Sequence, residues 1–187
     1  NDAIMHFSSE WFYGGKVRTA EAVRQRHGIL DYDIPIEWRS MTPEVMDATP
    51  ADTSETPEDA PAPSGEEFVG ESYGRINRSE AEETLTVLEE YFTKIGKQRI
   101  LDEQIDVGVI SPYRAQVQYL RRLIKKREFF KPYRRLITVN TVDGFQGQER
   151  DIILISMVRS NAEGQIGFLR DLRRMNVAIT RARMKLI

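Results

Sequence analysis

The sequence predicts an α/β fold in which a parallel sheet is flanked by helices. Strand-like apolar segments alternate with amphipathic segments of helical spacing, and this alternation favours parallel strands joined by crossover helices. Residues 152–155 are apolar without alternation, as expected of a strand covered on both faces. Residues 107–110 run directly into Ser111-Pro112, a serine N-cap followed by proline at the first helical position. A chain of 187 residues with 40% hydrophobic content is long enough for one globular domain.

Residues 1–38 are expected to form the N-terminal part of this domain. Apolar side chains keep near-helical spacing between Ile4 and Trp11, which predicts a short helix, and a pair of glycines ends it. We expect Trp11 and the two aromatic residues after it to pack in the core. Residues 34–36 alternate between apolar and polar side chains, which predicts a short strand.

Residues 39–74 differ from the rest of the chain in composition. They are rich in Thr, Ser, Pro, Ala and acidic residues and contain almost no large apolar side chain, so burial cannot offset the entropy of ordering them. Residues 44–90 carry fourteen Asp or Glu against two Arg. We predict a disordered linker or insertion that precedes the main body, residues 75–187. A solvated spacer is the favoured interpretation. The alternatives are recruitment of a protein partner and mimicry of nucleic acid that inhibits a basic face.

The main body contains further helix and strand signals. A helix is predicted to begin at Ser79, because Glu82 three residues later completes a capping box. The helix that follows Ser111-Pro112 is expected to end near Arg127. The remaining predicted elements are strands at residues 137–142 and 184–187 and a helix at residues 175–182.

Several functional classes are excluded by composition. The chain has no cysteine and only two histidines, His6 and His27, so disulfides, thiolate chemistry and a histidine metal cluster are not expected. No apolar run is long enough for a membrane span, and the first residues lack the layout of a signal peptide. We therefore expect a soluble intracellular protein, cytoplasmic or associated with the nucleoid or nucleus, with no metal site of its own.

Three polar clusters follow predicted strands, at residues 111–116, 141–149 and 173–183. In open parallel sheets, ligands bind outside the carboxyl ends of the strands. Arg174 lies at the start of a predicted helix, where the helix dipole disfavours a cation, and Arg181 lies seven residues later on the same predicted face. Together they could grip a triphosphate at that edge. A solvated basic face is the alternative for this helix, as a plain turn is for the glycines at 144 and 147.

The same segments resemble a known family. The runs TVDGFQGQERDIILIS and GFLRDLRRMNVAITRARMKLI resemble motifs V and VI of superfamily 1 helicases of the up-frameshift (RNA surveillance) type. SPYRAQ resembles motif IV, FSSEWFYGGKV resembles the opening of the second motor domain, and the stretch around Asn77 and Glu80 resembles the element that leads into motif IV. The resemblance covers nearly all of the chain outside residues 39–74. It implies a RecA-like domain of the P-loop NTPase fold, in second position and lacking the P-loop itself, because Val17 follows Gly15-Lys16 and Glu10 replaces the first glycine of that motif.

The resemblance also implies roles for individual residues. Arg181 is implied to be an arginine finger for ATP bound to the first RecA-like domain, with Arg174 as its catalytic companion. The residues implied to face the nucleotide are Gly147, Gln148 and Glu149. Those implied to lie along the nucleic-acid backbone are Tyr113, Arg114, Thr141, Val142 and Asp143. The ligands of Mg²⁺ are expected in the first domain.

The function implied is that of a motor domain in an ATP-dependent DNA or RNA helicase. Its expected partners are single-stranded nucleic acid, tracked from 5′ to 3′, and the first RecA-like domain of the same polypeptide; no oligomer is required, and the isolated fragment is expected to be inactive. The alternative is a RecA-like nucleic-acid-binding module without a motor cycle. A basic and aromatic segment, residues 121–135, either contacts phosphates and stacks bases or is a solvated face whose aromatic residues anchor it in the core.

Overall fold

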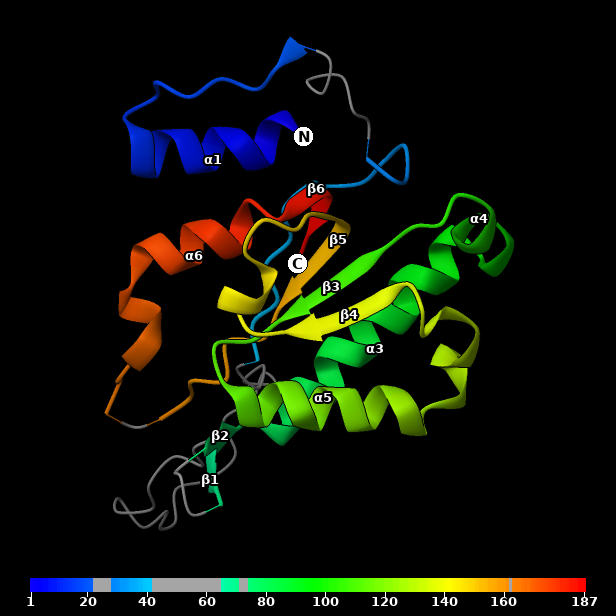
Figure 1. Cartoon of the computed structure of the whole chain (residues 1–187), viewed down its shortest axis with the longest axis vertical. Coiled ribbons are helices and arrows are strands. Elements are labelled where there is room, and N and C mark those ends of the chain that lie inside the picture. The colour runs from blue at the N-terminus through cyan, green and yellow to red at the C-terminus, as the bar shows by residue number, and fades with distance from the viewer. Residues whose placement is uncertain (22–27, 42–64, 71–73, 162) are drawn as a thin grey trace, which may run out of the picture.

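The computed structural model describes residues 1–21, 28–41, 65–70, 74–161 and 163–187. Its centre is a sheet of four parallel strands in the order β4-β3-β5-β6, with helices on both faces (Figure 1). The strands are β3 (Val107–Ile110), β4 (Ile137–Asn140), β5 (Arg150–Ile155) and β6 (Ala182–Leu186). The predicted α/β fold with a parallel sheet and flanking helices is confirmed, and the fold is that expected of a RecA-like helicase domain.

The order of the strands places a switch point between β3 and β5. The chain passes from β3 outward to β4 on one side and then returns to β5 and β6 on the other. Loops that leave β3 and β5 therefore diverge at the carboxyl end of the sheet, where α/β proteins bind ligands.

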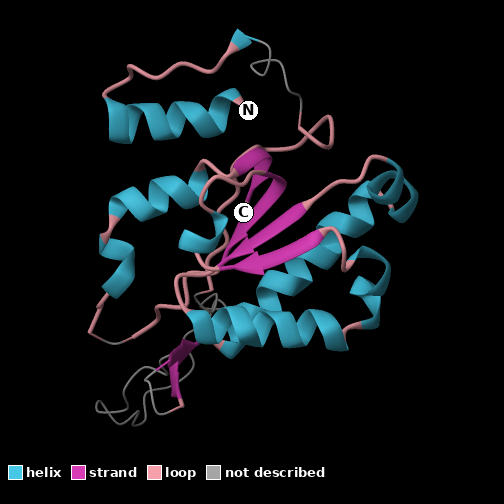
Figure 2. Cartoon of the chain, viewed as in Figure 1, coloured by secondary structure: helices cyan, strands magenta, loops and turns pink. Residues whose placement is uncertain are grey.

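Two hydrophobic cores lie on opposite faces of the sheet. One face is covered by helices α3 (Arg78–Ile95) and α5 (Arg114–Lys126), and α4 (Lys97–Asp102) lies at the end of that layer (Figure 1). The other face is covered by α6 (Leu172–Ile179), against which α1 (Asp2–Tyr13) packs. Figure 2 shows the resulting helix-sheet-helix layers. Strand β5 is buried in its middle, as its uninterrupted apolar run predicts.

Three predicted helix boundaries are wrong. Helix α3 begins one residue before Ser79, and Asn77 is its N-cap: its Oδ1 accepts a hydrogen bond from the Glu80 N–H at 3.0 Å. Helix α5 begins at Arg114 with no side-chain cap, so Ser111-Pro112 forms a connecting loop. The last helix begins after Asp171, whose carboxylate accepts from the first-turn N–H groups. At α3 the cap is selected by a tertiary contact, because the Gln116 side chain holds the Asn77 backbone through two hydrogen bonds.

The N-terminal part contains one confirmed element and two corrections. Helix α1 ends at a glycine in the left-handed conformation, as predicted. Trp11 and Tyr13 are 75% and 48% exposed and do not pack in the core, because α1 buries the side of Ile4 and Ser8 instead. The strand expected at residues 34–36 is reduced to an isolated parallel bridge between Ile36 and Leu186.

The predicted linker, residues 39–74, lies mostly outside the described residues. Its described C-terminal part contains a hairpin formed by β1 (Glu67–Val69) and β2 (Gly74–Ile76), which pair antiparallel. The main body thus extends further toward the N-terminus than its composition suggests. Among the described helices, none is long and apolar enough to cross a membrane.

Candidate functional site

The 141–149 loop connects the carboxyl end of β4 to the amino end of β5. It therefore runs from the side of the sheet where the strands end, the carboxyl edge, to the side where they begin, the amino edge. Its middle is held by Phe145, which is fully buried and lies above Gly108 of β3. A Cβ at Gly108 would lie 2.5 Å from Ile153 Cδ1 and 2.8 Å from Phe145 Cε1. The bare glycine therefore provides the space in which the aromatic ring anchors the loop to the sheet.

The two glycines of this loop have the conformational role that the sequence suggests. Gly147 has φ +76°, a region that favours glycine. A Cβ at Gly144 would collide with the Asn140 side chain. The turn is closed by Thr141, whose Oγ1 accepts from the Gly144 N–H at 3.3 Å and whose N–H donates to Asn140 Oδ1 at 2.9 Å.

Residues expected along nucleic acid gather at the carboxyl edge. Tyr113 and Arg114 follow β3, Thr141 follows β4, and the two loops are joined by a hydrogen bond from the Ser111 N–H to the Asn140 carbonyl oxygen at 3.2 Å. Arg114 and Asp143 are exposed. Val142 is buried against the core, so only its backbone can face a ligand.

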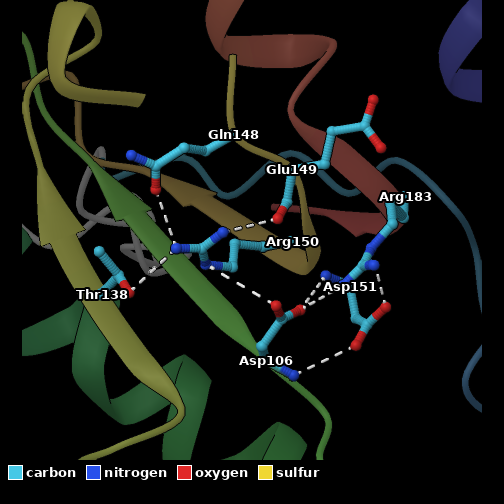
Figure 3. Close-up of polar contacts among 7 residues, drawn as sticks. All are labelled: Asp106, Thr138, Gln148, Glu149, Arg150, Asp151 and Arg183. Carbon is cyan, nitrogen blue, oxygen red and sulfur yellow. Dashed lines mark hydrogen bonds and ion pairs between the residues drawn. The ribbon is translucent and has the colours of Figure 1, made fainter. Parts of the chain in front are cut away.

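The residues expected to face a nucleotide lie at the opposite edge. Gly147, Gln148 and Glu149 are exposed and stand immediately before the amino end of β5. Gln148 Oε1 accepts from Arg150 Nη2 at 3.0 Å, while the Glu149 carboxylate points away from these contacts (Figure 3). The expectation that all three clusters lie at the carboxyl edge is therefore wrong for this part of the loop.

Arg181 also lies at the amino edge. Helix α6 ends at Ile179, so Arg181 is not on a common helical face with Arg174, and its carbonyl oxygen accepts from the Arg150 N–H at 2.9 Å. Its guanidinium donates only to neutral acceptors: the Val177 carbonyl at 3.0 Å, Thr180 Oγ1 at 3.1 Å and the Gln148 carbonyl at 3.4 Å. Within the described residues, its charge has no carboxylate partner.

Arg174 has a different environment. Its Nε lies 3.4 Å from Asp171 Oδ2, an i,i+3 pair at the start of α6, and 3.9 Å from Asp143 Oδ1. Its side chain is partly exposed. Arg174 thus contacts the part of the 141–149 loop that follows β4, whereas Arg181 contacts the part that precedes β5. The structure assigns the two arginines to opposite ends of one loop.

A buried polar cluster behind the carboxyl edge was given no role by the sequence analysis. The Glu80 carboxylate accepts from Ser156 Oγ at 2.7 Å and from the Val158 N–H at 2.9 Å, and Gln116 Nε2 donates to Ser156 Oγ at 3.1 Å. Gln116 also exchanges two hydrogen bonds of 3.0 Å with the Asn77 backbone. Burial raises the pKa of Glu80, although the hydrogen bonds from Val158 and Ser156 oppose the shift. This cluster ties α3 and α5 to the segment after β5.

A second network at the amino edge was also missed. Arg183 Nη2 lies 2.7 Å from Asp106 Oδ1, Arg183 Nε lies 3.1 Å from Asp151 Oδ1, and Arg150 Nε lies 3.8 Å from Asp106 Oδ2 (Figure 3). The two aspartates also accept each other's backbone N–H, at 2.7 and 3.2 Å. Burial, with the nearby Asp106 charge, raises the pKa of Asp151. The network fixes the starts of β3, β5 and β6 around Arg181.

The described residues contain no cluster of three or more His, Cys, Asp or Glu arranged to hold a metal ion. This structure does not test the prediction that a separate domain supplies the Mg²⁺ ligands.

Comparisons with known proteins relate the whole chain to helicases. The family model of the AAA domain matches residues 1–187. DNA polymerase alpha-associated DNA helicase A of Saccharomyces cerevisiae is 34% identical over 100% of this chain and 26% of its own length. An ATP-dependent helicase of Methanocaldococcus jannaschii is 39% identical over 100% of this chain and 24% of its own length. A regulator of nonsense transcripts 1 homolog of Drosophila melanogaster is 34% identical over 98% of this chain and 14% of its own length. The chain thus spans between 14% and 26% of the length of these relatives.

Proposed function

The chain belongs to the AAA domain family, among superfamily 1 helicases of the up-frameshift type, and from this premise we propose that it is the second RecA-like motor domain of an ATP-dependent helicase. The observation that carries the proposal is the position of Arg181. Its guanidinium lies beside Gln148 at the edge of the domain and, among the residues that the structure describes, is bound only to neutral acceptors, so an incoming phosphate would be its first anionic partner there.

Arg181 acts in this proposal as an arginine finger. Exchanging its contacts with the Gln148 carbonyl and Thr180 Oγ1 for oxygens of a γ-phosphate would bring a full positive charge to the transferring phosphoryl group. Such a residue contributes about 10³–10⁵-fold to the rate, or about 4–7 kcal/mol of the barrier. Gly147 and Glu149 stand at the same edge, and Arg174 would assist after releasing Asp143.

The carboxyl edge is proposed to hold the nucleic-acid backbone. Thr141 Oγ1 accepts from Gly144, and within the described residues its hydroxyl hydrogen has no acceptor, so it can donate to a phosphate oxygen. The backbone of Val142 and the side chains of Tyr113 and Arg114 flank it. Contacts to backbone phosphates can be made with DNA and with RNA.

The 141–149 loop connects the two proposed sites. Phe145 is buried against Gly108 and anchors the middle of the loop to the sheet. A displacement of Gln148 would therefore reach Thr141 through this short anchored segment. ATP bound to a first RecA-like domain of the same polypeptide, with its Mg²⁺, would close the two domains on Arg181, and hydrolysis would release them. Alternating grips would move the protein along a single strand, in the 5′ to 3′ direction that the family resemblance implies, and we propose that this chain alone is inactive. A cytoplasmic location remains a prediction.

Arg181→Ala in the intact protein tests the proposal. We expect the steady-state ATPase rate to fall by about 10³-fold or more, with nucleotide binding retained, because the finger stabilises the transition state and not the bound substrate. Arg173→Ala is the matched control: it removes an exposed arginine from the first turn of α6 and should leave turnover unchanged. Normal turnover in Arg181→Ala would exclude the assignment. The non-motor alternative predicts no ATPase activity in the parent protein or in Arg181→Ala.

A further inference from the structure

Helix α5 has an outward face made of cations. The helix contains no acidic residue along its length, and its buried side consists of Gln116, Val117, Leu120 and Ile124. The side that faces solvent carries six exposed residues, five of them basic: Arg114, Gln118, Arg121, Arg122, Lys125 and Lys126. Arg134 and Arg135 are also exposed and follow the helix after one short turn of 3₁₀ helix. We call the five basic residues of the helix the α5 basic face.

Helix stability accounts for only part of this face, because the helix dipole favours cations in the last turn, where Lys125 and Lys126 lie. Arg121 with Lys125 and Arg122 with Lys126 are like-charge i,i+4 pairs, each unfavourable by about 0.2–0.5 kcal/mol. Arg114 stands at the positive end of the helix dipole. No carboxylate of the described residues forms an ion pair with any of the five. Arg121 donates to the Val139 carbonyl oxygen at 3.0 and 2.6 Å, and the other four cations are available to an external anion.

The neighbouring helix has the opposite charge. Helix α3 exposes Glu82 and Glu90 on the same layer, and the boundary between the helices is marked by Arg127, which pairs with Glu82 and, at 2.7 Å, with Glu89. A polyanion on this layer would be repelled from α3 and confined to α5. Its path would start beside Arg114, at the carboxyl edge of the sheet, and run toward the far end of α5 (Figure 1).

The aromatic residues of this region do not offer stacking surfaces on the α5 basic face. Phe130 and Tyr133 are buried, and Tyr133 packs edge-on against Phe92 with ring centroids 4.8 Å apart. Phe129 packs on Phe130 at 5.3 Å and is 36% exposed, but it lies beside Glu89 and Glu90 of the acidic helix α3. Guanidinium groups of Arg78 and Arg122 lie over the Tyr119 ring, at 5.3 and 5.6 Å. Of the two interpretations of residues 121–135, the structure supports aromatic residues that anchor the segment in the core.

We propose that the α5 basic face binds the phosphate backbone of a nucleic-acid duplex. Sites for single strands combine cations with aromatic rings on which the bases stack, whereas a duplex presents phosphates and keeps its bases inside. The α5 basic face offers cations, and the one exposed ring described near it lies on the α3 side, so the face fits a duplex better than a single strand. Helix α5 has 13 residues, about 20 Å at 1.5 Å each, which matches roughly six base pairs of 3.4 Å rise. The inference rests on the proposed function only in placing this duplex next to the single-strand track.

The test is the salt dependence of binding by the intact protein. The variant replaces Arg122, Lys125 and Lys126 by Gln, and the probes are fluorescently labelled 20-mers, as DNA duplex, RNA duplex and single strand. Each duplex phosphate contact contributes about 0.9 to the slope of log K against log salt concentration, so we expect the duplex slope to become shallower by about 2–3. The single-strand slope should be unchanged. The duplex that shows the change identifies the nucleic acid.

A matched control removes the same charge elsewhere. Lys16, Lys94 and Lys97 are exposed lysines outside the α5 basic face, and their replacement by Gln should leave both slopes as in the parent protein. Thermal unfolding establishes that both variants are folded; in the α5 variant the removal of two like-charge pairs offsets the loss of two cations from the last turn of the helix. An unchanged slope on both duplexes, or an equal loss on the single strand, would overturn the inference. Loss of ATPase in Arg181→Ala is measured separately, so either proposal can fail alone.

Discussion

Replacing Gly108 by Ala tests whether Phe145 anchors the 141–149 loop. The new Cβ would lie 2.8 Å from Phe145 Cε1 and 2.5 Å from Ile153 Cδ1, and both side chains are fully buried, so neither can move freely. Overpacking of this kind costs about 1–3 kcal/mol. Gly108 lies in a strand and needs no positive φ, so alanine can adopt its backbone conformation. Alanine therefore adds about 0.4–1 kcal/mol of stability, because it restricts the unfolded chain more than glycine does. We expect a net loss of about 1–2 kcal/mol.

The assay is urea unfolding of the protein and its variants, read as the change in midpoint at constant slope. Phe145→Leu is the second arm of a double-mutant cycle, because it shortens the side chain that meets the new Cβ. The double variant should be more stable than the sum of the single effects predicts, by about 1 kcal/mol. Nucleic-acid affinity should fall in Gly108→Ala and recover in the double variant, since Thr141 belongs to the anchored loop. Additive effects, or a Gly108→Ala protein as stable as the parent, would refute this account of the loop.

Two further predictions concern buried charges. Because the folded pKa of Glu80 is raised above its usual value of 4.5, its contribution to stability is fully present below that pH and is lost as the pH rises through the folded pKa; Glu80→Gln should flatten this part of a urea-unfolding series across pH. Lys185 is 1% exposed and donates to Asp33 at 2.9 Å and Glu37 at 2.8 Å, so Lys185→Met should cost about 3–5 kcal/mol by leaving the buried Asp33 carboxylate without its cation. Arg39→Gln, which removes an exposed partner of Glu37, should cost less than about 1 kcal/mol by the same measurement, and equal effects would contradict this reasoning.

The division of the loop between two edges of the sheet bears on how the proposed motor would work. Thr141 and Arg114 lie at the carboxyl edge, while Gln148 and Arg181 lie at the amino edge beside the network of Asp106 and its partners. A single loop of nine residues therefore joins the proposed nucleic-acid-binding site to the proposed site for the γ-phosphate. Substitutions at its anchor should affect both activities together, whereas substitutions at one end should affect only one.

The identity and order of most elements could be read from the chain itself. Side-chain periodicity is a local property, so the buried run of β5, the amphipathic α5 and the glycine end of α1 are visible without coordinates. The motif residues were likewise recognisable as a set, because their spacing is a feature of the sequence.

Where those residues lie in space was decided by tertiary structure. The cap of α3 is Asn77 and not Ser79, because the buried Gln116 amide holds the Asn77 backbone in place. Arg181 is at the amino edge because α6 ends two residues before it and β6 begins immediately after it. The outcome depends on hydrogen bonds and packing between segments that are distant in the chain. A pattern of neighbouring residues contains no information about such partners, so it determines which side chains a site uses but not which edge of the sheet presents them.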